Sequence, residues 1–428
     1  MYKDSERRST LIGAAVKERL LHPIDQPLAS FIDWERLREN VSALHAAFPE
    51  DLQVLHAFAV KANSLVPVLR QLRNLGLGAE VASEGELAAA LEAGHEPARI
   101  VFDSPAKTTR ELARALELGV SINVDNFQEL DRIIELRSRI ASTSEIGIRL
   151  NPQIGAGTIA AMSTAGQRTK FGIPLRDPGV RERLVSTYLA NPWLTRAHTH
   201  VGSQGCSLEL IASGVSELVS FADEVNERAG RRQIRTLDIG GGLPVDFASD
   251  EPISRFDDYV EALRIGAPRL FSGDYGIVTE FGRSVLAKHG IVAAFVEYTK
   301  EVGGQRIAIT HAGAQVATRT VFMPEAWPLR VEVFDAEGRS RTGEGTREQD
   351  VAGPCCFAGD LVARGRELPV IQPGDIVALL DTGAYYASTP FSYNSLPVAP
   401  VYGVELQGDD PRFDEVRSGE RVLEAVRA

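Results

Sequence analysis

The sequence has few cysteines. Its 428 residues include three, too few for a disulfide framework in a chain of this length. Cys355 and Cys356 are adjacent and poorly placed to bridge each other, and Cys206 is remote from both. Unpaired thiols are typical of a reducing compartment, so we expect a cytoplasmic protein.

Long apolar segments and an excess of positive charge are also missing. Without an apolar run of 18 residues, no helix is expected to span a membrane. The polar segment Met1–Thr10 lacks the apolar core of a secretory signal. The formal net charge of −12 argues against nucleic acid or an anionic membrane as a partner, because either requires clustered positive charge.

Strand and helix patterns alternate between about residues 56 and 283. Several of the strand candidates are rich in Val and Ile, as buried parallel strands tend to be. Eight strands joined by helices predict a closed (β/α)8 TIM-type barrel, which we assign to residues 31–285. The candidates are His56–Val60, Ala79–Ala82, Arg99–Phe102, Val120–Val124, Ile146–Leu150, Ala197–Val201, Thr236–Ile239 and Gly276–Thr279.

The helical period fades after about residue 286, where Gly and Pro turns separate short apolar segments. This pattern predicts a second, all-β domain, a sandwich or barrel built from residues 1–30 and 286–428. Its expected strands are Leu28–Ile32, Ile291–Tyr298, Arg306–Thr310, Leu329–Phe334 and Asp375–Leu380, with a helix over Asp33–Phe48 leading into the barrel.

The residues at the ends of the predicted barrel strands are chemically reactive types. Active sites of such barrels lie at the C-terminal ends of the strands. Each residue alone could simply begin a loop, but the set together indicates a catalytic mouth. It comprises Lys61, Glu80, Asp103, Asp125, Arg149, His200, the glycines 240–242 and Glu280.

Lys61 directly follows an apolar run at the end of its strand. Partly dry surroundings disfavour the ammonium ion and lower the amine pKa, which suits imine chemistry. A single lysine at a strand end is usually only solvated, so the interpretation requires partners.

Two further motifs suit a phosphorylated heterocycle. Gly240, Gly241 and Gly242 follow a strand, and their N–H groups can surround a phosphate; the alternative is a flexible loop. Glu280 lies three residues before Arg283, a spacing that could place a carboxylate at a ring nitrogen and a guanidinium at a phosphate. An ordinary surface ion pair would have the same sequence.

Two histidines, His198 and His200, alternate on one predicted strand. A metal site would need a third ligand, which the spacing does not reveal, so we predict no metal. A flat imidazole stacked on an aromatic cofactor is the better use, with Ser203 near its phosphate.

Taken in order, these motifs resemble the alanine-racemase-fold pyridoxal-phosphate decarboxylases, which include ornithine, diaminopimelate and plant-type arginine decarboxylases. The resemblance runs from Pro27 to Val404 and is closest to the diaminopimelate and ornithine enzymes. The matching segments are Phe58–Asn63, Glu80–Leu87, His198–Gln204, Leu237–Gly242, Glu280–Arg283, Gly353–Asp360 and Gly383–Tyr385.

The resemblance implies a pyridoxal 5'-phosphate cofactor held by Lys61 as a Schiff base. It implies that His200 stacks on the ring, Glu280 bonds the ring nitrogen, and Cys356 helps to reprotonate the product from a neighbouring subunit. A homodimer with active sites at its interface follows. The remaining cofactor-binding residues are expected to be Glu80, Arg149, Ser203, Gly240, Gly241, Gly242, Gly282, Arg283 and Tyr385, and the substrate-binding residues Arg319, Phe357 and Tyr393.

The sequence departs from this family where the substrate's distal end is bound. An acidic residue that binds the distal amine normally follows the cysteine, but here Phe357 does. Removing a charge partner in a dry site costs on the order of 3–5 kcal/mol. Arg319, matching an arginine that binds a distal carboxylate, is retained, whereas a tyrosine expected nearby is Met323.

We therefore doubt ornithine, lysine and meso-diaminopimelate as substrates, and expect an amino acid or conjugate with an anionic or bulky distal end. Related decarboxylases of siderophore and antibiotic pathways act on citrate-conjugated or carrier-bound amino acids. Two alternatives remain open: a racemase, against which Glu280 argues because racemases of this fold place an arginine at the ring nitrogen, and a non-catalytic relative, against which Lys61 and Cys356 argue.

Overall fold

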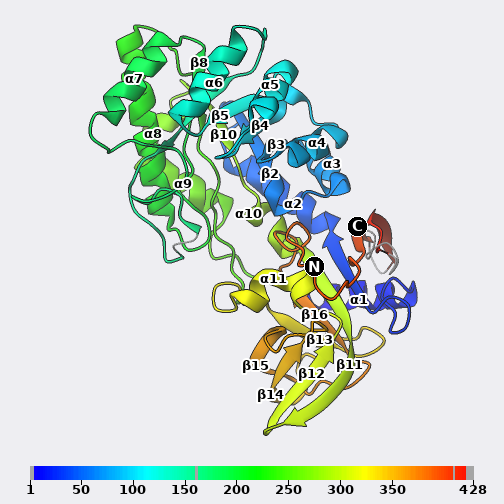
Figure 1. Cartoon of the computed structure of the whole chain (residues 1–428). Coiled ribbons are helices and arrows are strands. Elements are labelled where there is room, and N and C mark those ends of the chain that lie inside the picture. Colours follow the sequence, from blue (N-terminus) through cyan, green and yellow to red (C-terminus); the bar gives the residue numbers. More distant parts are fainter. Residues whose placement is uncertain (1–3, 160–161, 408–409, 421–428) are drawn as a thin grey trace. The chain divides into compact units, whose positions relative to one another are not determined.

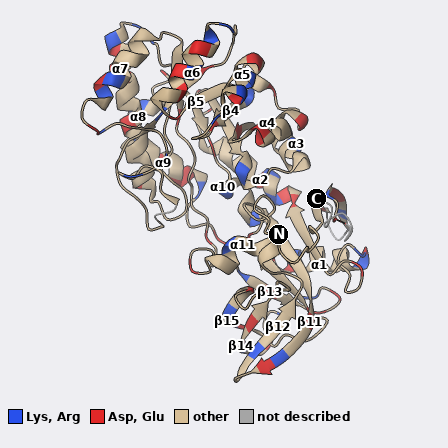
Figure 2. Ribbon diagram, in the orientation of Figure 1, with Lys and Arg blue, Asp and Glu red and all other residues tan. Residues whose placement is uncertain are grey.

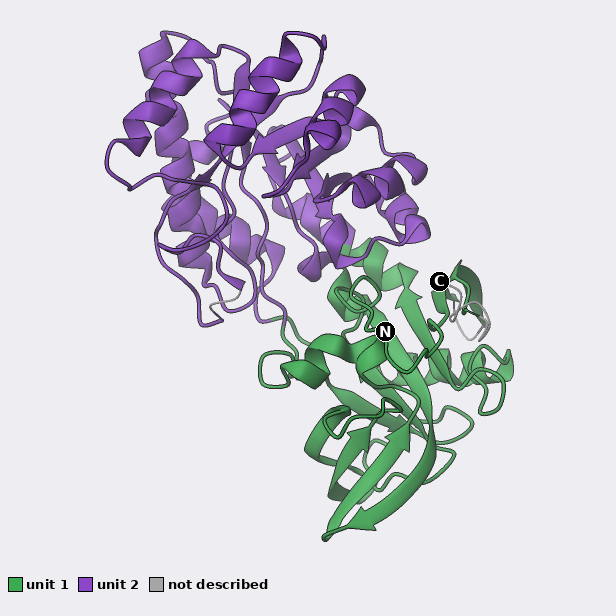
Figure 3. Ribbon diagram, in the orientation of Figure 1, with its two compact units in different colours: residues 1–40, 246–252, 286–428 green, residues 41–245, 253–285 purple. Residues whose placement is uncertain are grey.

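The computed structural model describes residues 4–159, 162–407 and 410–420. The chain divides into two compact units (Figure 3). Unit 1 contains residues 1–40, 246–252 and 286–428, and unit 2 contains residues 41–245 and 253–285. The chain therefore passes from unit 1 into unit 2 and returns to unit 1 at residue 286. Residues 246–252, between the two segments of unit 2, also belong to unit 1.

Unit 2 is a closed barrel of eight parallel strands (Figure 1). The spatial order is β5-β4-β3-β2-β10-β9-β8-β6, and pairing of β5 with β6 closes the ring. A two-residue strand, β7 (Ile173–Pro174), extends from β6. The barrel strands are β2 (Val54–Ala59), β3 (Gly78–Val81), β4 (Ile100–Asp103), β5 (Ser121–Val124), β6 (Ile146–Asn151), β8 (Leu194–His198), β9 (Thr236–Asp238) and β10 (Gly276–Thr279). The predicted barrel is confirmed.

Helices follow most of the barrel strands and lie around them (Figure 1). Local sequence sets their ends: the Ser83 side chain accepts the N–H of Glu86, and Thr108 forms a capping box with Glu111. The helices are α2 (Trp34–Ala47), α3 (Val66–Asn74), α4 (Glu84–Glu92), α5 (Thr109–Leu118), α6 (Phe127–Arg137), α7 (Val180–Ala190), α8 (Leu208–Ala229), α9 (Phe256–Gly266) and α10 (Arg283–Leu286).

The barrel strands are buried along their length, as expected for strands covered on both faces. Every residue of β3, β4, β5 and β6 is buried. Several of these buried residues carry charge, namely Glu80, Asp103, Arg149, Arg196 and Asp238. Buried charges require partners, so these residues must form ion pairs inside the barrel.

Unit 1 is built on a branched sheet in the order β15-β14-β12-β11-β1-β17-β18, with β16 also paired to β11 and β13 to β16. The strands are β1 (Leu28–Asp33), β11 (Gly290–Val302), β12 (Gln305–Thr310), β13 (Val331–Phe334), β14 (Thr346–Ala352), β15 (Leu361–Pro369), β16 (Ile376–Leu380), β17 (Val401–Gln407) and β18 (Asp410–Arg417). The predicted second domain is confirmed as mostly sheet rather than all-β, although β14, β15, β17 and β18 were not predicted. Charged residues such as Arg347 and Arg366 interrupt the apolar alternation of β14 and β15.

Two helices of unit 1 were also not predicted. Helix α1 (Asp4–Lys17) buries Leu11, Ile12 and Ala15 in the core of this unit. Helix α11 (Ala314–Phe322) carries Arg319. Helix α1 occurs where the apolar period is weak, so tertiary packing decides its conformation.

Charged residues of both signs are interspersed over the barrel helices (Figure 2). Among the described residues, no helix is long and apolar enough to cross a membrane.

Candidate active site at the barrel strand ends

Lys61 lies in a single 3-10 turn, Val60–Ala62, directly after β2. Its Nζ is 2.8 Å from Oε2 of Glu80, at the end of the neighbouring strand β3. The lysine side chain is 46% exposed, so the described barrel does not by itself supply the dry surroundings expected from the sequence. An exposed amine on a buried carboxylate is instead accessible to a reagent that enters the barrel mouth.

Glu80 is fully buried, and its second carboxylate oxygen has no hydrogen-bond partner among the described residues. Burial raises the pKa of Glu80, and Lys61 opposes this effect. The carboxylate therefore depends on the lysine amine, or on a bound group that replaces it, for its charge partner.

Asp103 and Arg149 form a buried ion pair between β4 and β6. Burial would raise the pKa of Asp103, but Arg149 and nearby positive groups hold it below the usual range. The guanidinium of Arg149 also lies 4.5 Å from the ring centre of Phe171. Arg149 is thus held on two sides, which fixes the direction of its remaining N–H donors.

Of the two histidines that the sequence placed on one strand, only His198 belongs to it. Strand β8 ends at His198, which enters a group of buried carboxylates, whereas His200 lies beyond the strand. Nδ1 of His200 accepts the N–H of Gly241 at 3.2 Å. Burial and the charge of Arg149 lower the pKa of His200 well below its ordinary value, so its ring is neutral. A neutral, flat ring suits the stacking role that the sequence predicted.

The glycines after β9 allow two loops to approach closely. A Cβ at Gly241 would lie 2.3 Å from the carbonyl oxygen of Glu280, and one at Gly242 would lie 2.1 Å from that of Gly202. Gly242 also has a positive φ of 117°. Side chains would therefore fill this cradle, and only glycines leave its backbone accessible to a phosphate.

Glu280 follows β10, and its backbone N–H donates to the carbonyl of Gly240 at 2.8 Å. The side chain is buried, and Oε1 has no hydrogen-bond partner among the described residues. An unsatisfied buried carboxylate oxygen is costly. A protonated ring nitrogen would satisfy it, so this residue fits the heterocycle that the sequence predicted.

The barrel mouth also contains residues that sequence reasoning left out of the site. Asp238 is fully buried, its Oδ2 accepting from Asn123 at 2.9 Å and lying 3.2 Å from Arg196. His198 lies between Asp238 and Asp103. The position of Asp238 at the end of a strand and before the glycine run could have identified it, but the partners of His198 follow only from closure of the barrel.

The predicted substrate residues belong to unit 1. Arg319 lies 4.4 Å from the ring centre of Tyr385 and 5.2 Å from that of Trp327, and its Nη1 has no hydrogen-bond partner among the described residues. Burial lowers the pKa of Arg319, and Tyr385 opposes this. A guanidinium between rings and without a carboxylate partner is suited to an anion supplied from outside.

Phe357 belongs to a cluster of four rings, which we call the aromatic cluster: Phe322, Phe357, Phe391 and Tyr393. Phe357 stacks on Phe322 with a centroid distance of 5.6 Å and meets Tyr393 edge-on at 5.6 Å. Phe322 is 53% exposed and Tyr393 is 37% exposed. At the position where the related decarboxylases have an acidic residue, this chain therefore has a partly exposed apolar surface.

The loop that carries the adjacent cysteines is fixed by buried Asp360, which accepts the backbone N–H groups of Cys355 and Ala314. Cys355 is buried and Cys356 is exposed. The backbone N–H of Cys356 donates to the side chain of Asn394 at 2.8 Å. The loop thus presents the Cys356 thiol to the outside.

The closed barrel, the strand-end lysine, the glycine cradle and the buried Glu280 fit the pyridoxal-phosphate site that the sequence predicted. The family model "Pyridoxal-dependent decarboxylase, pyridoxal binding domain" matches residues 34–287. The chain belongs to this family of pyridoxal-dependent decarboxylases.

Individual relatives support the same assignment. The chain is 32% identical over 392 residues to a diaminopimelate decarboxylase of Pseudomonas aeruginosa, covering 90% of each chain. It is 31% identical over 429 residues to one from Methanothermobacter thermautotrophicus, covering 99% of this chain and 96% of the relative.

A crystal structure of diaminopimelate decarboxylase from Helicobacter pylori complexed with L-lysine superimposes with a TM-score of 0.83. The sequence identity is 27%, and the match covers 96% of this chain and 98% of the other. The protein is therefore a pyridoxal-phosphate-dependent amino-acid decarboxylase, a carboxy-lyase.

Proposed function

We propose that Lys61 holds the cofactor and that the strand-end residues orient it for decarboxylation. The observation that carries this assignment is the exposed Lys61 amine on the buried carboxylate of Glu80. When bound, pyridoxal phosphate accepts the electrons left when the substrate's carboxylate departs as carbon dioxide. Glu280 keeps a proton on the ring nitrogen, and His200 supports the ring face.

The phosphate is assigned to the glycine cradle. Gly240, Gly241, Gly242 and Gly282 leave room for its oxygens, and Arg283, Ser203 and Tyr385 complete its surroundings. Arg149 is assigned to the same cofactor site, with its pairing to Asp103 fixing the guanidinium. We assign no metal to the site.

The direct test is release of carbon dioxide from amino acids by cofactor-loaded protein. Lys61→Ala should lose both the visible absorbance band of the lysine-bound cofactor and turnover, whereas Lys300→Ala, on an exposed part of β11, should keep both. A change of chirality without carbon dioxide release would support the racemase alternative. Turnover by Lys61→Ala would contradict the assignment.

We infer that the active enzyme is a homodimer in which Cys356 of one subunit serves the barrel of the other. The exposed thiol and the partly exposed aromatic cluster support this, because contiguous exposed apolar surfaces commonly mark protein interfaces. In this arrangement the Cys356 thiol supplies the proton that replaces the departing carboxylate.

We propose an amino acid with an anionic or bulky distal end as the substrate, rather than ornithine, lysine or meso-diaminopimelate. Arg319, with its unpartnered Nη1, suits a distal carboxylate, and Tyr393 and Phe357 supply apolar surface. The rings around Phe357 offer no charge to balance a distal ammonium.

Substrate preference can be tested with Phe357→Glu. The substitution should raise kcat/KM for meso-diaminopimelate relative to the wild-type enzyme and lower it for substrates with an apolar distal end. Phe357→Leu is the matched control, because it removes the ring without adding charge. Rapid wild-type turnover of meso-diaminopimelate that Phe357→Glu slowed would overturn the proposal.

The cellular compartment is also a proposal. All three cysteines are unpaired, which supports a reducing environment such as the cytoplasm.

A further inference from the structure

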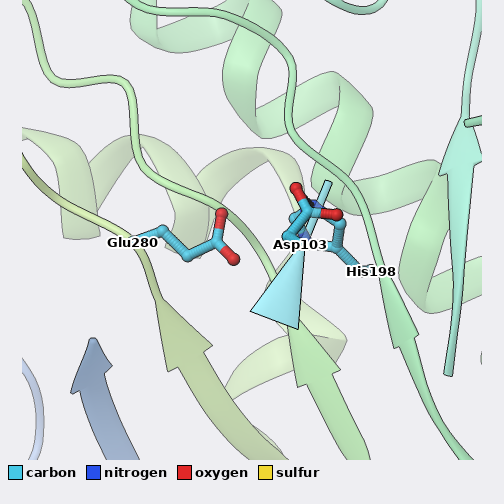
Figure 4. Close-up of side chains that lie close together, drawn as sticks. All are labelled: Asp103, His198 and Glu280. Atoms are coloured by element: carbon cyan, nitrogen blue, oxygen red, sulfur yellow. Dashed lines mark ion pairs between the residues drawn. The ribbon is translucent and has the colours of Figure 1, made fainter. Parts of the chain in front are cut away.

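Asp103, His198 and Glu280 form a buried group at the centre of the barrel mouth (Figure 4). They come from β4, from β8 and from the residue that follows β10. One carboxylate oxygen of Asp103, one ring nitrogen of His198 and one carboxylate oxygen of Glu280 lie within 4.8 Å of one another. His198 is not needed to hold the cofactor in the proposed function, so its role requires a separate explanation.

The acceptors around the ring of His198 favour its protonated form. Nδ1 is 3.0 Å from the backbone carbonyl of Asp238 and 3.2 Å from that residue's carboxylate. Nε2 is 3.6 Å from Oδ2 of Asp103 and has no hydrogen-bond partner within the described part of the chain. Carbonyl and carboxylate oxygens are acceptors only. Nδ1 must therefore carry a proton, and the carboxylate that faces Nε2 favours a second proton there, which makes the ring an imidazolium.

Charge balance in the barrel mouth identifies what this imidazolium does. Three buried carboxylates of the barrel mouth have a Lys or Arg partner: Glu80 has Lys61, Asp103 has Arg149 and Asp238 has Arg196. Among the ion pairs between described residues, none contains Glu280. Its nearby positive charge is His198.

The charges around the pair act in both directions. Burial raises the pKa of Glu280 well above its ordinary value, Asp238 raises it further, and His198 lowers it. Burial lowers the pKa of His198, but Asp238, Glu280 and Asp103 raise it well above its ordinary value. The charged and titratable groups around the pair come from the barrel strands, from the segments that follow them and from α9: Lys61, Glu80, Asp103, Arg149, Arg196, His200, Asp238 and Tyr259.

We propose that His198 is a positioning residue for Glu280, a buried cation whose charge favours the ionised Glu280 carboxylate where it faces the cofactor's ring nitrogen. This inference rests on the proposed function of Glu280. Without the imidazolium, Glu280 would take up a proton, lose its attraction for a protonated ring nitrogen and weaken the electron acceptor. His198 thus acts on the reaction through Glu280 and does not itself touch the substrate.

The first experiment uses the protein without cofactor. In protein labelled with 15N-histidine, one of the eight histidines should remain doubly protonated at pH 8, and its signal should be absent from His198→Asn. His95→Asn is the matched control, because His95 is buried and its pKa is lowered to about 4. Eight neutral histidines in the wild-type protein at pH 8 would overturn the proposal, even if His198→Asn failed to fold.

The second experiment reads the ring nitrogen directly, with 15N-labelled pyridoxal phosphate bound to the protein. Wild type and His95→Asn should hold the proton on this nitrogen to the same pH. His198→Asn should lose it at least one pH unit lower, a tenfold fall in proton affinity. An unchanged titration in a folded, loaded His198→Asn would refute the assignment. If no visible band forms with any variant, the proposed function fails, while the histidine spectrum still tests His198.

Discussion

The amine of Lys61 lies 2.8 Å from the carboxylate of Glu80, and the two side chains differ sharply in exposure, at 46% and 1%. The ion pair thereby holds an accessible amine against a buried carboxylate. Their strands β2 and β3 are neighbours in the barrel, with Ala59 aligned to Glu80. The carboxylate holds the amine at the barrel mouth before any cofactor arrives.

Removing the charge of Glu80 should slow capture of the cofactor by Lys61. We expect Glu80→Gln to reduce the rate of band formation by about tenfold, equivalent to roughly 1.4 kcal/mol, because the amine loses its charged partner. Glu80→Asp should retain most of the rate. Stopped-flow absorbance after addition of pyridoxal phosphate measures the effect, with exposed Glu92→Gln as control. An equal rate in Glu80→Gln would show that the ion pair has no part in capture.

The adjacent cysteines should react very differently with iodoacetamide. Cys356 is exposed, whereas burial raises the pKa of Cys355 to about 11, and the thiolate is the nucleophile. Mass spectrometry at pH 8 should find the label on Cys356 well before Cys355. Cys356→Ala should lose most turnover while Cys355→Ala retains it. Preferential labelling of Cys355 would contradict the geometry of this loop.

Mixing two inactive variants should restore activity if subunits share their sites. Lys61→Ala and Cys356→Ala, unfolded and refolded together, would give hybrid dimers that contain one native site each. Because half of the dimers are hybrids, about a quarter of wild-type activity is expected. Refolding each variant alone supplies the control. No recovery in a mixture that forms dimers would place Lys61 and Cys356 of one site in the same subunit.

His56 should make the stability of the barrel depend on pH. It is buried against Thr279, and burial lowers its pKa to about 3. Below pH 6.5, His56 is protonated in the unfolded chain but stays neutral in the folded chain. The free energy of unfolding therefore falls as the pH decreases from about 6.5 towards 3. The effect is about 1.4 kcal/mol per pH unit within that window.

Urea unfolding of wild type and His56→Gln, at pH 7 and pH 5, measures this effect. The variant should lose roughly 2 kcal/mol less between the two pH values, whatever its stability at pH 7. His311→Gln, a partly exposed histidine of unit 1, is the control. An identical pH dependence in His56→Gln would mean that His56 is protonated in the folded state.

The sequence predicted the barrel and the presence of Lys61 and Glu80 at its mouth because both depend on near-neighbour relations. Strand periodicity locates each strand end, and neighbouring parallel strands place their ends together. The helix that begins at Ser83 was predictable from its capping residues.

The group around His198 was not predictable in this way. It joins β4, β8 and the residue after β10, which come together only through closure of the barrel and the register of its strands. Alternation along the predicted strand placed His198 and His200 on one face, but β8 ends at His198, so His200 lies in the segment that follows the strand. Helix α1 was missed because its stability comes from tertiary contacts of Leu11 and Ile12 with unit 1.

Strand β1 imposes an order on the maturation of this protein. It is among the first segments made, yet it pairs on one edge with β11 and on the other with β17, near the end of the chain. The barrel strands, which lie between residues 54 and 279, can assemble while the ribosome is still translating. The sheet of unit 1 cannot form completely until synthesis is almost finished, so the backbone hydrogen-bonding groups of β1 remain unpaired until then. Chaperones that protect exposed strand edges are therefore expected to act on the nascent chain for most of its translation.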